Sequence, residues 1–382
     1  MDTKTIIIPN SYMKNYLVKS KSLLCFFVML CISTQSIFGT TNIWVKPYEI
    51  NFDYEPGQGD DAITIRDEDG DEAPIPEWKY SPSRNNSIAY IKSQTDRKIK
   101  VKFDSNCSDM HLIINLTVTS GTGIGEVCNH VIMNYEDLQE VTLTLEGNIP
   151  NNVDVRQFTW KWEIYGITNE SGYCSAKSTN YTTHTYYTVL TTPQSPMAEP
   201  WSNVLDYACE WASGKSTESD VISSITNSLY NCGVEYDGAT HYTSGYYSLN
   251  LSLLLDHLDT PSTVQMDCRD FANFLHVLTN SLGLSGKYNV INNLSPPYDF
   301  DYNYILPAGL DEEITGNWLM HQVGWYNYKV ADASAKIDND SSPSSSPHSW
   351  KLVVGDMLLS AYLDKLSEEP LSSVQTGTCS PF

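Results

Sequence analysis

The sequence predicts an α+β protein with two parts, an all-β region over residues 43–195 and a mixed region over residues 200–382. The first part contains short runs of alternating apolar and polar residues between Gly, Pro, Asn and Asp clusters, a pattern typical of a β-sandwich. The second part opens with segments whose apolar residues repeat at helical spacing. Three prolines within 191–200 predict a linker, because proline resists both helix and strand.

Residues 1–39 are predicted to be a secretory signal. Four lysines come before or at the edge of an apolar run, SLLCFFVMLCISTQSIFG, which ends in small residues suited to cleavage. The run is shorter than the roughly 20 residues of a spanning helix, although an uncleaved anchor is the alternative. We therefore expect a secreted, periplasmic or cell-surface protein without stable membrane insertion.

The net charge of −23 argues against a nucleic-acid partner, because such a field repels phosphate backbones. The acidic stretch Arg66–Glu72 has Glu72 where a calcium-binding EF-hand loop needs its glycine, and Trp78 stands where that loop needs its bidentate glutamate. A solvated loop is therefore favoured over a calcium site. We expect no metal, no cofactor and a monomeric protein.

The all-β region is predicted from six runs. The expected strands are AITIRD (62–67), KIKVKF (98–103), HLIINLTV (111–118), EVTLTLEG (140–147), FTWKWEIYGI (158–167) and THTYYTVL (183–190).

The mixed region is predicted to place most of its helices first. The expected helices lie within 201–214, 216–233, 248–259, 264–284 and 355–369, and the expected strands lie within 286–291 and 321–332. The acidic and aromatic segment 296–313 is predicted to form a lid or a substrate wall. A Ser/Pro-rich loop covers 339–349.

Seven cysteines lie beyond the signal, and an odd number leaves at least one thiol free in a monomer. Cys268 is the candidate for that thiol, because it stands beside charged residues at a helix start. The other six are expected to form disulfides in an oxidising compartment. The expected pairs are Cys107–Cys128, Cys209–Cys232 and, by elimination, Cys174–Cys379.

The stretch VQMDCRDFANFLHVLTNSLGL (264–284) carries the clearest chemical signal. Asp267 is a natural N-cap, and Asp270 can complete a capping box. Cys268 then lies in the first helical turn, where the helix dipole and free N–H groups stabilise a thiolate and can bind an oxyanion. This position predicts an exposed nucleophile. The alternatives are a disulfide partner or a core cysteine.

A cysteine nucleophile needs a base, and the sequence offers His321 at the start of a strand pattern, with Asp332 eleven residues later. Two adjacent antiparallel strands would place Asp332 beside His321, where it could orient the imidazole. His276 lies on the same helix as Cys268, roughly 12 Å away at the helical rise, so it is excluded. The alternative base is His348 in the Ser/Pro-rich loop. Asp332 could instead be a turn residue.

DCRDFANFLHVLTNSLGL and HQVGWYNYKVADAS resemble the transglutaminase-like cysteine hydrolase superfamily. The resemblance implies a papain-like α+β core in which Cys268 is the nucleophile, His321 the base and Asp332 the orienting acid. Cross-linking members usually carry Gln or a small residue where this chain has Asp267. Gln265 is the candidate oxyanion donor. The all-β region resembles the immunoglobulin-like modules of secreted bacterial enzymes in its strand pattern.

These features predict a secreted cysteine-dependent amide hydrolase that acts through an acyl-thioester on a protein, peptide or peptidoglycan-type substrate. Hydrolysis is favoured because no segment indicates a site for an amine acceptor. The alternatives are a protein-glutamine acyltransferase, a related papain-like cell-wall peptidase, and a surface module that binds carbohydrate or protein and retains a vestigial core.

Overall fold

The computed structural model describes residues 44–53, 62–67, 70, 72, 74–95, 97–105, 110–121, 124–125, 127–133, 140–168, 175–239, 241–258, 260, 264–293, 296 and 298–382. The expected signal segment, Cys107 and Cys174 lie outside these residues, and the side chain of Cys128 is likewise not described. The predicted Cys107–Cys128 pair therefore stays a prediction.

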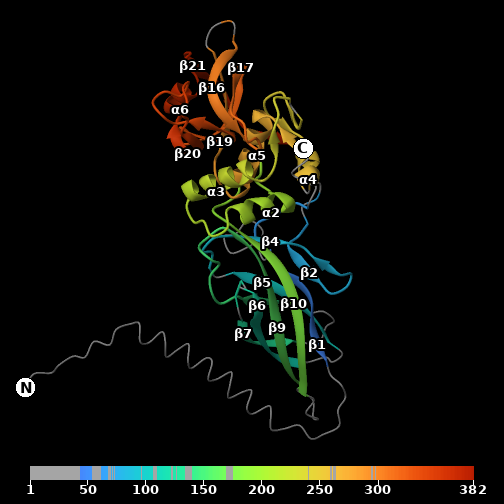
Figure 1. Ribbon diagram of the computed structural model, residues 1–382. Helices are drawn as coiled ribbons and strands as arrows, with labels where there is room; N and C mark the ends of the chain where they lie inside the picture. The colour runs from blue at the N-terminus through green and yellow to red at the C-terminus, as the bar shows by residue number, and fades with distance from the viewer. Residues whose placement is uncertain are drawn as a thin grey trace, which may run out of the picture.

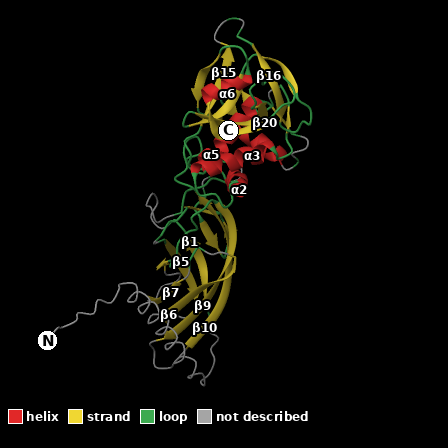
Figure 2. Ribbon diagram, turned by 60° about the vertical axis from the view of Figure 1, so that its left-hand side comes forward, coloured by secondary structure: helices red, strands yellow, loops and turns green. Residues whose placement is uncertain are grey.

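Two sheets, each with five strands in the described part of the chain, make up the N-terminal region (Figures 1 and 2). One has the order β3-β2-β1-β5-β8 and the other β4-β10-β9-β6-β7. The strands are β1 Val45–Asn51, β2 Glu77–Lys79, β3 Arg84–Asn85, β4 Ile88–Ile91, β5 Lys98–Ser105, β6 Met110–Gly121, β7 Val127–Met133, β8 Glu140–Thr144, β9 Asp154–Thr168 and β10 Ser175–Val189.

Both sheets contribute to one hydrophobic core. In β5 every second residue is buried, so Ile99, Val101 and Phe103 point inward, and they share the core with Trp160 and Trp162 of the other sheet. This period of two is the alternation that the sequence displayed. Five of the six predicted runs are strands, but AITIRD forms only isolated bridges such as that between Ile63 and Ala89.

The C-terminal region combines helices with a larger sheet (Figure 1). Its helices are α2 Ser202–Trp211, α3 Glu218–Tyr230, α4 Leu251–Leu258, α5 Cys268–Ser281 and α6 Leu359–Leu366. The sheet has the order β17-β16-β19-β18-β15-β21, with β20 also paired to β19. Its strands are β15 Lys287–Asn293, β16 Phe300–Pro307, β17 Ile314–Trp318, β18 His321–Tyr326, β19 Lys329–Asp338, β20 Trp350–Leu358 and β21 Leu371–Gly377. Short strands β11 Glu235–Tyr236, β12 Thr243–Ser244, β13 Ser248–Leu249, β14 Gln265–Met266 and β22 Ser380–Pro381 complete the region.

The chain is thus a mixture of helix and sheet with more strand than helix, in keeping with the predicted α+β class. The segment 296–313, expected to form a lid or a substrate wall, is largely part of the sheet: Phe300–Pro307 form β16, which pairs with both β17 and β19. The substrate wall stays a prediction. The alternating burial of β16 places apolar side chains such as Ile305 in the core, which a mobile lid would expose.

The expected linker over 191–200 is packed between the two regions. Thr191 donates its backbone N–H to Leu282, and Gln194 donates to Asn280 at the end of α5. Met197 is fully buried. The prolines do prevent helix and strand here, but the segment is fixed by the core that both regions share.

Helix α5 lies close to the sheet at Gly324 of β18. A Cβ atom at this glycine would come within 2.9 Å of Leu275 and 3.1 Å of the Ala331 carbonyl. A side chain here would force Leu275 to move, so the glycine favours this close approach. It packs the middle of α5 against β18 beside β19, the two strands that carry His321 and Asp332.

The described cysteines do not form the predicted disulfides. Cys209, Cys232, Cys268 and Cys379 are all free thiols, so the Cys209–Cys232 and Cys174–Cys379 pairs are wrong in this structure. Cys209 faces the core from the middle of the apolar face of α2, and Cys232 donates to the carbonyl of Leu229. The prediction failed because sequence proximity to helix ends does not fix the direction of a side chain.

Among the described residues, no helix is both long and apolar enough to cross a membrane.

Candidate active site

The first turn of α5 is fixed by the predicted capping box. The Asp267 carboxylate accepts the backbone N–H groups of Arg269 at 2.9 Å and Asp270 at 3.0 Å. Asp270 accepts the backbone N–H of Asp267 at 3.2 Å in return. This reciprocal arrangement satisfies donors that an α-helix leaves free at its start, and it fixes the backbone on both sides of Cys268.

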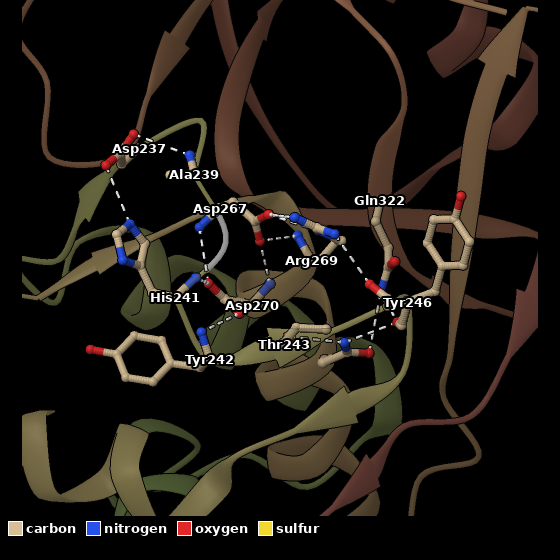
Figure 3. A network of polar contacts seen from close by, with 12 residues as sticks. Asp237, Ala239, His241, Tyr242, Thr243, Tyr246, Asp267, Arg269, Asp270 and Gln322 are labelled. Atoms are coloured by element: carbon tan, nitrogen blue, oxygen red, sulfur yellow. Dashed lines mark hydrogen bonds and ion pairs between the residues drawn. The ribbon is translucent and has the colours of Figure 1, made fainter.

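Figure 3 shows how the same aspartates anchor a neighbouring segment. Asp270 also accepts the backbone N–H groups of His241 and Tyr242, at 3.3 and 3.2 Å. The Arg269 guanidinium pairs with Asp267 at 2.7 Å. Burial raises the pKa of the Asp270 carboxyl, and the charge of Asp267 adds to this effect. The polar residues of the DCRD motif therefore build the frame around the cysteine.

Cys268 is buried, with 5% of its surface exposed, in contrast to the predicted exposed thiol. Burial raises its pKa well above the usual value, and the charge of Asp267 raises it further. A backbone hydrogen bond from Gln322 acts in the opposite direction. Burial therefore opposes formation of a thiolate at this helix start, because the loss of water around the sulfur disfavours its charged form.

The predicted base and acid lie side by side. His321 begins β18, Asp332 lies in β19, and Nε2 of the imidazole is 3.1 Å from Oδ2 of the carboxylate. The hairpin between the two strands turns at Asn327 and Tyr328, both with positive φ. Two such residues form the tight turn that suits the twist of antiparallel strands. His321 and Asp332 are 0% and 2% exposed.

A third group, the hydroxyl of Tyr362 in α6, joins this pair. It donates to Asp332 Oδ2 at 2.6 Å and lies 3.1 Å from His321 Nε2. Ser334 donates to the other oxygen of Asp332 through its backbone N–H at 2.9 Å and its hydroxyl at 2.7 Å. Burial alone would raise the pKa of Asp332, but His321 and these donors outweigh it and hold the pKa below its usual value.

The other ring nitrogen of His321, Nδ1, is buried and has no hydrogen-bond partner among the described residues. The charge of Asp332 adds to the raised pKa of the Cys268 thiol, and the backbone of Gln322, the residue after His321, bonds to the sulfur. Cys268 is thus linked to β18 one residue beyond His321, and its contact with the imidazole stays a prediction.

Aromatic side chains cover the imidazole. The Trp318 ring stacks on His321 with centroids 4.4 Å apart and planes 8° from parallel, and Tyr302 stacks on the far side of Trp318 at 4.0 Å. Trp318 itself is only half-buried. It is the layer that separates the histidine from solvent on this side.

Three residues of the site escaped the sequence analysis: Trp318, Gln322 and Tyr362. Gln322 donates its side-chain amide to Tyr246 at 3.0 Å and to Asn273 at 3.2 Å, and so links β18 to α5 (Figure 3). Its place directly after His321 was the only available signal. Tyr362 lies on the apolar face of a helix, and nothing local distinguishes it from a core tyrosine.

The alternative base, His348, belongs elsewhere. Its Nδ1 lies 2.7 Å from Asp338, the last residue of β19. Asp338 is six positions beyond Asp332, which is roughly 20 Å along a strand. Gln265, the candidate oxyanion donor, is exposed on β14. His276 is buried within α5 and contacts Asn280 at 3.0 Å, as a structural histidine would.

Comparisons with known proteins give the fold only faint parallels. No family model and no curated protein matches the sequence. Among solved structures, red sea bream transglutaminase matches with a TM-score of 0.33 and 11% identity over 66% of this chain. The chain spans 49% of that transglutaminase. A Cytophaga hutchinsonii protein, provisionally described as a cysteine protease, matches with a TM-score of 0.21 and 10% identity, covering 69% of this chain and 77% of its own.

Proposed function

We propose that this protein is a cysteine-dependent hydrolase of amide bonds that acts through an acyl-thioester on Cys268. The observation that supports the proposal is a buried histidine whose Nε2 lies 3.1 Å from a carboxylate, on a strand whose next residue, Gln322, contacts a thiol at the start of a capped helix. This is the constellation that nucleophilic acyl transfer needs.

The proposed reaction uses His321 twice. Nδ1 takes the thiol proton of Cys268 while the sulfur attacks the carbonyl carbon of the amide, forming a tetrahedral oxyanion. Nδ1 then gives the proton to the leaving amine, and the C–N bond breaks to leave the acyl-thioester. A water molecule, deprotonated at Nδ1, attacks the thioester and releases the acid and the free thiol.

The capping box determines which backbone N–H groups at the start of α5 remain free to bind the oxyanion. Asp267 occupies the N–H groups of Arg269 and Asp270. As the first helical residue, Cys268 keeps a backbone N–H without an acceptor in the helix. We assign this N–H to the oxyanion. The exposed Gln265 could join it only after a movement of β14.

We propose a protein, peptide or peptidoglycan-type substrate and a location outside the cytoplasm, as the sequence suggested. One observation favours a second function, a surface-binding module with a vestigial core. Cys268 is buried and its thiol pKa is raised, mainly by that burial. In such a core the thiol would be inert. The two functions differ in the reactivity of one sulfur atom.

Iodoacetamide labelling of the unreduced protein at neutral pH, followed by peptide mapping, separates the two functions. Cys232 is half-buried and is a matched competitor, since it is a free thiol that solvent reaches more easily than Cys268. Activation by His321 should make Cys268 react first despite its burial. In His321→Ala the order should reverse.

Equal or faster labelling of Cys232 in the wild-type protein would contradict the enzyme and support the vestigial core. Turnover of a labelled peptide library should also be lost, by at least roughly 10³-fold, in Cys268→Ala. The loss in the double variant Cys268→Ala, His321→Ala should be no larger, because the two residues act as one unit.

A further inference from the structure

We propose that Tyr362 is a positioning residue for the base assigned above: its hydroxyl fixes which nitrogen of His321 carries the proton and tempers the basicity of the His321–Asp332 pair. The inference rests on the proposed function, because it gives a role to a fourth residue of the same site. Tyr362 comes from α6, far along the chain from Cys268, and is 0% exposed.

The three polar groups form a closed triangle. The Tyr362 hydroxyl is 2.6 Å from Asp332 Oδ2 and 3.1 Å from His321 Nε2, and Nε2 is 3.1 Å from the same carboxylate oxygen. A phenol has one proton. The shortest contact, to the carboxylate, uses that proton, so the phenolic oxygen is an acceptor toward Nε2.

Nε2 therefore faces two acceptors and must carry the ring proton. A neutral imidazole has only one N–H, so Nδ1 keeps its lone pair. Nδ1 is also the ring atom that is buried without a hydrogen-bond partner in the described part of the chain. The Tyr362 hydroxyl thus favours the tautomer with the proton on Nε2. In this tautomer Nδ1 keeps a lone pair that can accept the thiol proton.

The Tyr362 hydroxyl also disperses the negative charge of the Asp332 carboxylate. Asp332 Oδ2 receives hydrogen bonds from both Tyr362 and His321, and its partner oxygen receives two from Ser334. Each donor disperses the negative charge of the carboxylate. Loss of the tyrosine donor would leave more charge facing the imidazole, and a more negative neighbour raises the pKa of a histidine.

The test compares Tyr362→Phe with Tyr326→Phe. Tyr326 is a matched control, since it is also buried and its hydroxyl bonds to Thr279 at 2.9 Å, away from the histidine. In the Cys268→Ala background, ¹⁵N NMR of His321 reports the tautomer and the pKa without any need for turnover. In the protein with Cys268 intact, kcat and KM are measured against pH.

Tyr362→Phe should populate the second tautomer and move the acidic limb of the kcat–pH profile to higher pH. It should lower kcat about 5–20-fold and leave KM within about twofold, because the substrate does not touch the tyrosine. Tyr326→Phe should change none of these. An unchanged tautomer and pH profile in Tyr362→Phe, or an equal effect in Tyr326→Phe, would overturn the proposal.

If the wild-type protein shows no turnover, the proposed function fails, while the NMR measurements still decide the role of Tyr362. If Tyr362→Phe does not fold, 3-fluorotyrosine at position 362 replaces it. This residue keeps the ring and the hydroxyl and is a stronger donor. The acidic limb of the kcat–pH profile must then move to lower pH, and an unchanged profile or a shift to higher pH would reject the inference.

Discussion

Two histidines, one in each region of the molecule, are both fully buried, and they show what burial does with and without a carboxylate. His184 lies in the N-terminal sandwich core beside Phe52 and Trp160, and its ring bonds to Thr182 at 2.8 Å. His321 lies in the C-terminal site beside Trp318 and Asp332. In both rings Nδ1 has no hydrogen-bond partner among the described residues.

The two histidines differ in the charge of the groups beside them. Burial lowers the pKa of His184 to about 3, because no acidic group offsets the loss of water around the cation. At neutral pH it is a structural aromatic ring with a hydrogen bond. His321 instead faces an ionised aspartate that itself holds a lowered pKa. A buried histidine becomes a useful base only where a fixed carboxylate supports its charged form.

The largest effect should come from removing that carboxylate charge. Asp332→Asn should reduce kcat/KM by roughly 10²–10⁴-fold, because the amide group can donate to Nε2 and so favour the wrong tautomer. The matched control is Asp338→Asn, which removes the same charge from the other His–Asp pair of strand β19. Steady-state kinetics of both variants check this. Similar losses of kcat/KM in the two variants would contradict the role of His321 as the base, because Asp338 contacts His348 and not His321.

The free energy of unfolding should depend on pH in a way that reveals the buried, neutral state of His184. Its folded pKa of about 3 lies below the ordinary value of 6.5, so the unfolded chain binds the proton first as pH falls. Stability should therefore decline below pH 6.5, by about 2 kcal/mol at pH 5 from this residue. Urea unfolding of the wild type and of His184→Phe measures the difference.

The decline should be smaller in His184→Phe, although His276, whose burial lowers its pKa to about 4, adds its own part in both proteins. Catalytic constants at neutral pH should not change, since His184 lies in the other region. Identical pH profiles of stability in the two proteins would mean that His184 is not held neutral by burial.

The smallest effect on catalysis should come from removing Trp318, whose ring stacks on His321. Trp318 is half-buried, whereas Phe52, Phe158 and Trp160 beside His184 are fully buried. Trp318→Ala should admit water to the imidazole and weaken its interaction with Asp332, with a loss of about 3–10-fold in kcat. The thermal midpoint should fall by only a few degrees. Trp318→Phe, which keeps a stacked ring, should recover most of the activity.

Local sequence was enough to predict the helix start and the strands that carry the site. The capping box of Asp267 and Asp270 and the hairpin around Asn327 depend on residues within a few positions of one another. Alternation in β5 and helical spacing in α5 likewise reflect which face of an element is buried. The order of Cys268, His321 and Asp332 could be proposed for the same reason.

Tertiary structure decided the burial and the long-range contacts of those residues. The burial of Cys268 and the contact of Tyr362 with Asp332 arise between segments distant in the chain. The packed state of the expected linker over 191–200 and the place of β16 within the sheet depend equally on such long-range packing.

The sequence by itself therefore determined which chemical groups are present and which local elements carry them. The protonation of these groups was decided by the folded structure, because desolvation and hydrogen bonding act through space and have no pattern along the chain.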